Sequence, residues 1–236
     1  MTFGREALGR LMRGRAVASF VRLALRDGDP DALELLVRAL DGGLAPARLD
    51  ATGAELAGLA EHDAAFAARL SEVASESEAL RSALDRWRRG GRCAESGLDR
   101  AADREIAARM RAAFGGSGAL PLDALAADFA FAASRPAAAA ELEDAVEEQP
   151  RDLFEAALPL VETLDAESRA RLRDEVFAPL ISESGDVVIA ALERAAAGSA
   201  ALRALLRETP RGDADDEVWR RVQDAATARP DEEGRA

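Results

Sequence analysis

Hydrophobic residues recur at intervals of three and four positions along almost the whole chain. In the first segment, 3–26, they are Leu8, Leu11, Met12, Ala16, Phe20 and Leu23. This spacing places apolar side chains on one face of an α-helix. Val and Ile are few, and no run alternates with a period of two, so we expect no β-strand. The pattern therefore predicts an all-α fold.

Capping and breaking residues set the bounds of the other predicted helices. Asp29 and Pro30 suit the N-cap and first position of a helix that stops at Gly42–Gly43, and Ser75 to Glu78 is a capping box that opens another helix. We expect the remaining segments at 53–60, 63–74, 75–89, 98–114, 122–134, 136–148, 151–164, 167–183, 186–197, 200–207 and 215–228.

A weak internal repeat accompanies these helices. Similar apolar patterns follow Asp31, Asp123, Asp152 and Asp186, and the last three starts are separated by the length of one helical hairpin. Such spacing resembles an irregular HEAT-like α-solenoid of antiparallel helix pairs. An irregular helical bundle gives the same pattern. The resemblance concerns architecture alone and implies no activity.

Glycine-rich breaks suggest how the chain is divided. The first clear break is the segment 90–97, which is rich in Gly and contains Arg92 and Cys93. We therefore predict an N-terminal helical region at 1–89, a Gly/Arg linker at 90–97, and a C-terminal helical region at 98–210. The last helix and an acidic tail occupy 211–236, and the second glycine-rich break, 115–118, lies inside the C-terminal region.

The composition excludes several kinds of chemistry. The chain has no Lys and no Tyr, so it has no Schiff-base lysine, no P-loop lysine and no phenolic nucleophile. A single His and a single Cys cannot form a two-histidine zinc site or an intramolecular disulfide. We expect no catalytic residue set, no metal and no cofactor.

The charge is strongly acidic, with 31 basic residues against 44 acidic ones and a net charge of -13. All the basic residues are Arg, and the chain contains no Lys, Asn or Tyr. A genome of high GC content favours this composition, because the codons of the three missing residues begin with two A or T bases. The acidic surplus is typical of extreme halophiles, in which negative charge keeps proteins in solution in concentrated salt. A halophile or another high-GC bacterium is the expected source.

No segment reaches the roughly 18 apolar residues that a membrane span needs. Arg22 interrupts the only stretch similar to a signal-peptide core, and no Ala-x-Ala site follows it. A single Cys fits a reducing compartment. We expect a cytoplasmic protein without a transmembrane segment.

The N-terminal segment reverses the overall charge, because 1–26 holds six arginines and one glutamate. Candidate binding residues in it are Arg10, Arg13, Arg15 and Arg22. A basic amphipathic helix binds an anionic membrane surface peripherally, nucleic-acid phosphates or an acidic protein. The other interpretation is that these arginines pair with the protein's own acidic helices.

A second basic cluster contains Arg86, Trp87, Arg88, Arg89 and Arg92. Arginines around an exposed aromatic ring suit a phosphate or an unstacked base. The other interpretation is a helix C-terminus, where cations favour the dipole and Trp87 packs inward. Cys93 lies beside these arginines, which lower a thiol pKa, and is either reactive or incidental.

These observations favour a non-catalytic helical interaction module, which is an adaptor, scaffold or regulator that binds a protein partner or a second copy. The alternative is a nucleic-acid-binding regulator that uses the two arginine clusters. A third hypothesis is a carboxylate- and Mg²⁺-dependent enzyme, for which Glu141, Asp144 and Glu148 share a helix face.

Overall fold

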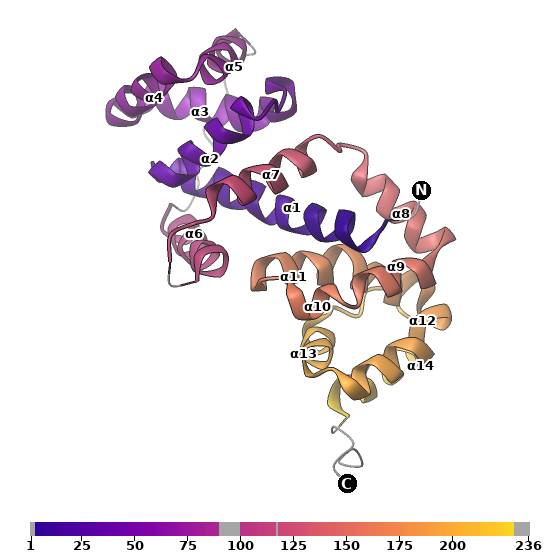
Figure 1. Ribbon diagram of the computed structural model, residues 1–236. Coiled ribbons are helices and arrows are strands. Elements are labelled where there is room, and N and C mark those ends of the chain that lie inside the picture. The colour runs from indigo at the N-terminus through magenta and orange to yellow at the C-terminus, as the bar shows by residue number, and fades with distance from the viewer. Residues whose placement is uncertain (1–2, 90–99, 117, 229–236) are drawn as a thin grey trace. The chain divides into compact units, whose positions relative to one another are not determined.

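The described part of the chain folds into helices and connecting turns (Figure 1). The computed structural model describes residues 3–89, 100–116 and 118–228, and within these ranges there is no strand. The predicted all-α multi-helix array is confirmed. No helix in the described ranges has the length and the apolar character needed to cross a membrane.

Contacts between backbone positions divide the chain into two compact units. Unit 1 comprises 1–12 and 136–236, and unit 2 comprises 13–135. Helix α1 (Arg5–Arg26) contributes its first turns to unit 1 and the rest to unit 2. These bounds differ from the predicted regions, and the predicted linker 90–97 lies outside the described residues. The division into 1–89, 98–210 and 211–236 stays a prediction.

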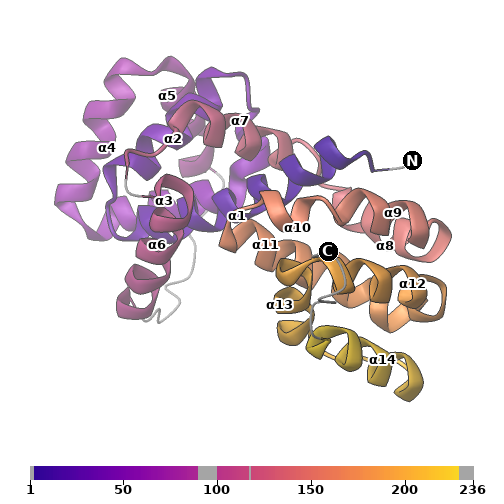
Figure 2. The same ribbon diagram turned by 60° about the horizontal axis from the view of Figure 1, so that its bottom comes forward.

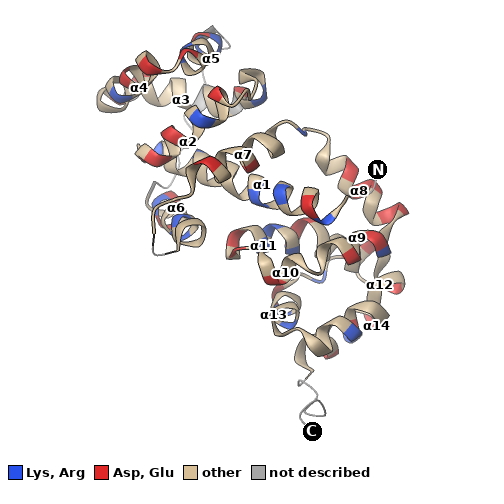
Figure 3. Cartoon of the chain, in the orientation of Figure 1, with Lys and Arg blue, Asp and Glu red and all other residues tan. Residues whose placement is uncertain are grey.

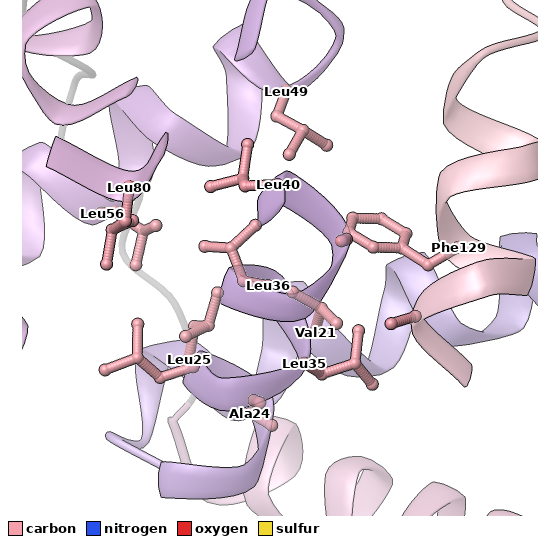
Figure 4. Close-up of a cluster of buried hydrophobic side chains, with 14 of the residues drawn as sticks. Val21, Ala24, Leu25, Leu35, Leu36, Leu40, Leu49, Leu56, Leu80 and Phe129 are labelled. Atoms are coloured by element: carbon pink, nitrogen blue, oxygen red, sulfur yellow. The ribbon is translucent and has the colours of Figure 1, made fainter. Parts of the chain in front are cut away.

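Unit 2 is built around a short amphipathic helix. Its elements after α1 are α2 (Pro30–Asp41), the 3₁₀ turn η1 (Pro46–Leu49), α3 (Asp50–His62), α4 (Ala64–Glu76), α5 (Glu78–Arg89), α6 (Arg100–Gly115) and α7 (Leu122–Ala133). Leu35 and Leu36 of α2 are fully buried, and helices α5 and α7 both contact α2. Figure 4 shows Val21 and Leu25 of α1 and Phe129 of α7 around these leucines.

The caps of α2 and α5 follow from local sequence. The carboxylate of Asp29 accepts hydrogen bonds from the backbone N–H groups of Asp31 and Ala32, and Pro30 occupies the first helical position. For α5 the capping residue is Ser77, whose Oγ accepts from the N–H of Leu80 at 3.1 Å. The helix is therefore capped two residues after the predicted Ser75, and the residue three positions after Ser77 is Leu80, which cannot complete a capping box.

Unit 1 is arranged around a long apolar helix. Its elements are α8 (Ala138–Glu148), α9 (Pro150–Ala157), α10 (Leu160–Thr163), α11 (Ala166–Leu172), the π-helical turn η2 (Arg173–Phe177), α12 (Ala178–Gly198), α13 (Ala200–Glu208) and α14 (Asp216–Thr227). Helix α12 contacts α8, α9, α13 and α14. At Gly185 it passes so close to α14 that an added Cβ would lie 2.5 Å from Val218 Cγ1.

Two predicted helix bounds in unit 1 are wrong. The segment 151–164 breaks before α10, because Pro159 has no N–H to donate and its ring disfavours a continuous helix. No new helix starts at Asp186, which lies inside α12. A kink marks the place instead: Ser184 has φ −130° and ψ 24°, and its Oγ donates to the carbonyl of Val146 at 2.8 Å. The repeat that used Asp186 as a helix start therefore loses one of its members.

Candidate functional site

The arginines of α1 are largely engaged within the protein. Arg13 Nε donates to Asp128 Oδ2 at 2.6 Å, and Asp128 is only 9% exposed. Arg10 and Arg15 are half-buried and each has an interaction partner, whereas Arg22 is exposed. Figure 3 shows basic positions along α1 and acidic positions on most other helices. Of the four predicted binding residues on this helix, Arg22 lies most open to a partner.

The second basic cluster is divided between surface and core. Arg86 makes a bidentate ion pair with Asp50 at 2.9 and 2.8 Å, and this hydrogen bonding holds the pKa of the Asp50 carboxyl below its usual value. Arg88 is exposed. The side chain of Arg89, together with Arg92 and Cys93, lies outside the described part of the chain.

Trp87 lies in the core of unit 2. Its side chain is 3% exposed, and its Nε1 donates to the carbonyl of Pro46 at 3.3 Å. Gly53 lies against the ring, so that a Cβ there would be 1.9 Å from Trp87 Cδ2. The ring is not open to an unstacked base, because α3 and η1 cover it. Phosphate binding by the surrounding arginines stays a prediction.

Elsewhere in unit 2, arginines pair with aspartates at helix starts. Arg111 pairs with the N-cap Asp29 and with Asp31, while Arg38 pairs with Asp123 in the first turn of α7. Carboxylates at helix N-termini are favoured by the dipole, and bidentate guanidinium groups then link these starts to other helices. Much of the arginine content of this unit therefore serves its own packing.

In unit 1 three arginines act at helix C-termini. Arg203, 9% exposed, donates to the carbonyls of Ala196 and Ala197 at the end of α12. Arg169 donates to the carbonyl of Leu164 at the end of α10, and Arg207 donates to that of Ala226 in the last turn of α14. A cation at these positions satisfies unpaired carbonyl oxygens and opposes the negative end of the helix dipole.

A pocket lies between α13 and α14, which run side by side in both views (Figures 1 and 2). Its volume is about 310 Å³. The residues that line it are Leu206, Arg207, Trp219, Gln223, Asp224, Ala226 and Thr227. Trp219 is half-buried and faces this space, in contrast to the buried Trp87. The pocket thus combines an aromatic wall, two small or aliphatic side chains and several polar groups.

Of two arginines near this pocket, Arg220 forms ion pairs with carboxylates of the described residues and Arg207 does not. Arg220 pairs with Asp224 at 2.9 Å and with Glu217 at 2.6 Å, so the Asp224 carboxylate already has an arginine partner. Arg207 donates one hydrogen bond to Ala226, and no carboxylate among the described residues forms an ion pair with it. Its remaining N–H groups are available to an acceptor that enters the pocket.

The sequence hypotheses overlooked Trp219. One signal was present: it is the only aromatic residue after Phe177, and it lies on the strongly amphipathic segment 215–228 that was predicted as a helix. Aromatic residues and Arg are enriched at the energetic centres of protein interfaces. A lone Trp beside arginines near the end of a helical unit therefore marks a candidate contact.

Acidic residues are dispersed over the described helices. Glu141, Asp144 and Glu148 all lie on α8, and no three His, Cys, Asp or Glu side chains in the described ranges are grouped closely enough to hold a metal ion. No family model, curated protein or solved structure that was compared with the chain gives a significant match. The candidate site consequently rests on the geometry of the α13–α14 pocket.

Proposed function

We propose that this chain is a non-catalytic helical interaction module of the cytoplasm, acting as an adaptor, scaffold or regulator. In this proposal a partner protein binds at the pocket between α13 and α14. The observation that supports it is the half-buried ring of Trp219, which lines an open hollow next to a guanidinium group, Arg207, without an ion-pair partner in the described part of the chain.

The chemistry of the pocket specifies the partner segment. Leu206, Ala226 and the Trp219 ring offer an apolar surface that suits one large aliphatic or aromatic side chain. A carboxylate beside that side chain would accept hydrogen bonds from the free N–H groups of Arg207. The proposed partner therefore presents a large apolar residue next to Asp or Glu.

A peptide selection tests this function. The full chain is immobilised and used to select binders from a random library of twelve-residue peptides, and the affinities of the enriched peptides are then measured. We expect them to share a large apolar residue adjacent to an acidic one. Trp219→Ala should weaken binding at least tenfold, because truncating a central aromatic anchor costs about 2 kcal/mol or more. Arg207→Gln should weaken the binding of the peptides that contain an acidic residue severalfold.

Two control variants match these changes on a neighbouring helix of the same unit. Val187→Ala removes an exposed apolar side chain of α12, and Arg194→Gln removes an exposed guanidinium from the same helix. Both should leave the affinities unchanged. Enriched peptides that lack the apolar–acidic pair, or that bind Trp219→Ala as tightly as the parent protein, would overturn the proposal.

The nucleic-acid hypothesis supplies a second arm of the same experiment. Binding of a thirty-nucleotide single-stranded DNA is measured by fluorescence anisotropy, with Arg22→Gln and Arg88→Gln as variants, since both side chains are exposed. If no peptide is enriched while the DNA binds and both variants weaken it, the module binds nucleic acid and not a peptide. Under the proposed function, the DNA binds weakly and the pocket variants alone change peptide affinity.

A further inference from the structure

Several charged side chains attach helix α6 to α1 and α2. Three aspartates lie where α1 ends and α2 begins: Asp27 in the connecting turn, Asp29 at the N-cap of α2 and Asp31 in its first turn. Arginines of α6 pair with all three. Arg104 pairs with Asp27 at 2.5 Å, and Arg111 pairs with both Asp29 and Asp31. In a fourth ion pair α6 supplies the carboxylate: Asp103 of α6 lies 3.3 Å from Arg26 of α1. Three of these ion pairs thus attach α6 to the short segment where α1 ends and α2 begins.

These ion pairs are accessible to solvent to different degrees. The side chains of Arg104 and Asp27 are 62% and 41% exposed, and those of Arg111 and Asp31 are both 37% exposed. The pair Arg26–Asp103 is the most shielded, at 14% and 16%, and in the pair Arg111–Asp29 the carboxylate is 20% exposed. Exposed pairs are screened by dissolved salt far more than buried ones. The pairs Arg104–Asp27 and Arg111–Asp31 are therefore the most open to screening.

The apolar attachment of α6 is narrow by comparison. Ala107 and Met110 are its buried hydrophobic side chains, and the half-buried Ile106 and Phe114 also pack against the core of unit 2. Phe114 meets the ring of Phe20 edge-on, with ring centroids 5.8 Å apart, and Arg111 lies 5.8 Å from the centroid of the same Phe20 ring. Only two of these four apolar side chains are buried, one of them an alanine, so the apolar area that holds this sixteen-residue helix once the charges are screened is modest.

We propose that α6 is a salt-sensitive latch, which undocks from α1 and α2 as ionic strength rises while the other helices of unit 2 stay folded. The Debye length falls from about 10 Å at 0.1 M salt to about 3 Å at 1 M. Undocking uncovers Phe20, which is fully buried when α6 is in place. Local opening of this kind belongs to the low-stability end of a folded protein.

Hydrogen exchange of the full chain tests the latch. Protection of the α6 amides is measured from 0.1 to 1 M NaCl and compared with that of α2 and α12 in the same sample. We expect α6 to lose protection at least fivefold over this range, while α2 and α12 change less than twofold. Equal salt responses of the three helices would overturn the proposal, as would a simultaneous loss of protection throughout unit 2.

Variants separate the charges from a general loss of stability. The double variant Arg104→Gln/Arg111→Gln should reproduce the high-salt exchange of α6 at 0.1 M NaCl. Arg173→Gln, which removes pairs to Asp174 and Glu208 in unit 1, is the matched control and should leave α6 unchanged. Unaltered α6 protection in the double variant would show that the ion pairs do not hold the helix.

A charge exchange gives the sharpest readout, because it restores attraction without restoring the native residues. Arg104→Asp places two carboxylates against each other and should increase α6 exchange at 0.1 M NaCl. Adding Asp27→Arg reverses the pair, and protection should return to within twofold of the parent protein. Failure of the second change to recover protection, with α2 still protected, would contradict a latch held by charge.

Discussion

Gly53 lies directly against the ring of Trp87, where an added Cβ would be 1.9 Å from Cδ2 and 2.1 Å from Cε2. This contact brings α3 and α5 together and closes the core of unit 2 over the indole. It also explains why Trp87 is unavailable as a surface aromatic, although arginines surround it in the sequence. The side chain stabilises the fold and does not face a ligand.

Replacing Gly53 with Ala should therefore destabilise unit 2. The new methyl group forces the indole or α3 to move, and overpacking of this kind costs about 1–3 kcal/mol. Urea unfolding measures the change in the free energy of unfolding. Gly58→Ala is the control on the same helix, because a Cβ there meets nothing within 4 Å. Gly58→Ala should leave the free energy of unfolding unchanged or raise it by up to about 1 kcal/mol. If both variants lowered it by similar amounts, the close packing of Gly53 against Trp87 would be contradicted.

The ion pair between Arg86 and Asp50 makes a pH-dependent prediction. The pKa of Asp50 is lowered chiefly by hydrogen bonds from Arg86, so the pair contributes stability at neutral pH that is lost as the pH falls through the lowered pKa. In Arg86→Gln the Asp50 pKa should rise toward the ordinary value of about 3.9. Carbon-13 NMR titration of the carboxyl group measures it, and an Asp50 pKa unchanged by the substitution would refute the assignment.

Arg203 gives a prediction on the stability of unit 1. Its guanidinium is almost buried and donates to Ala196 and Ala197 at the C-terminus of α12. Arg203→Met keeps much of the apolar stem but leaves these carbonyls without a donor, which should cost about 1–3 kcal/mol. Calorimetric thermal unfolding measures the loss. Arg194→Met, at an exposed position of α12, is the control and should stay within about 0.5 kcal/mol of the parent protein.

Local features of the fold could be predicted from the sequence. Asp29 with Pro30, Asp63 and Asp215 each mark a helix start correctly, because a capping interaction depends on residues only two or three positions apart. The gap predicted between 183 and 186 is instead a kink at Ser184 inside α12, because the Ser184 hydroxyl bonds to Val146 of another helix. The caps, unlike the kink, need no knowledge of the tertiary structure.

The burial of the two tryptophans could not be predicted in this way. Trp87 and Trp219 are each followed by two arginines on an amphipathic helix, yet one is in the core and the other lines a pocket. What distinguishes them is a glycine of α3, distant in sequence, which lets the backbone approach the first ring. The partners of Arg13 and Arg111, 115 and about 80 positions away, depend on tertiary packing in the same way.

The fluorescence of Trp219 most directly tests whether a partner enters the α13–α14 pocket. In a Trp87→Phe variant, Trp219 is the only tryptophan, so its emission reports the pocket alone. Saturation with a selected apolar–acidic peptide should shift the emission to shorter wavelength, because the half-exposed ring loses water, and the midpoint should match the measured affinity. A peptide that binds this variant without changing the emission would show that the partner binds elsewhere.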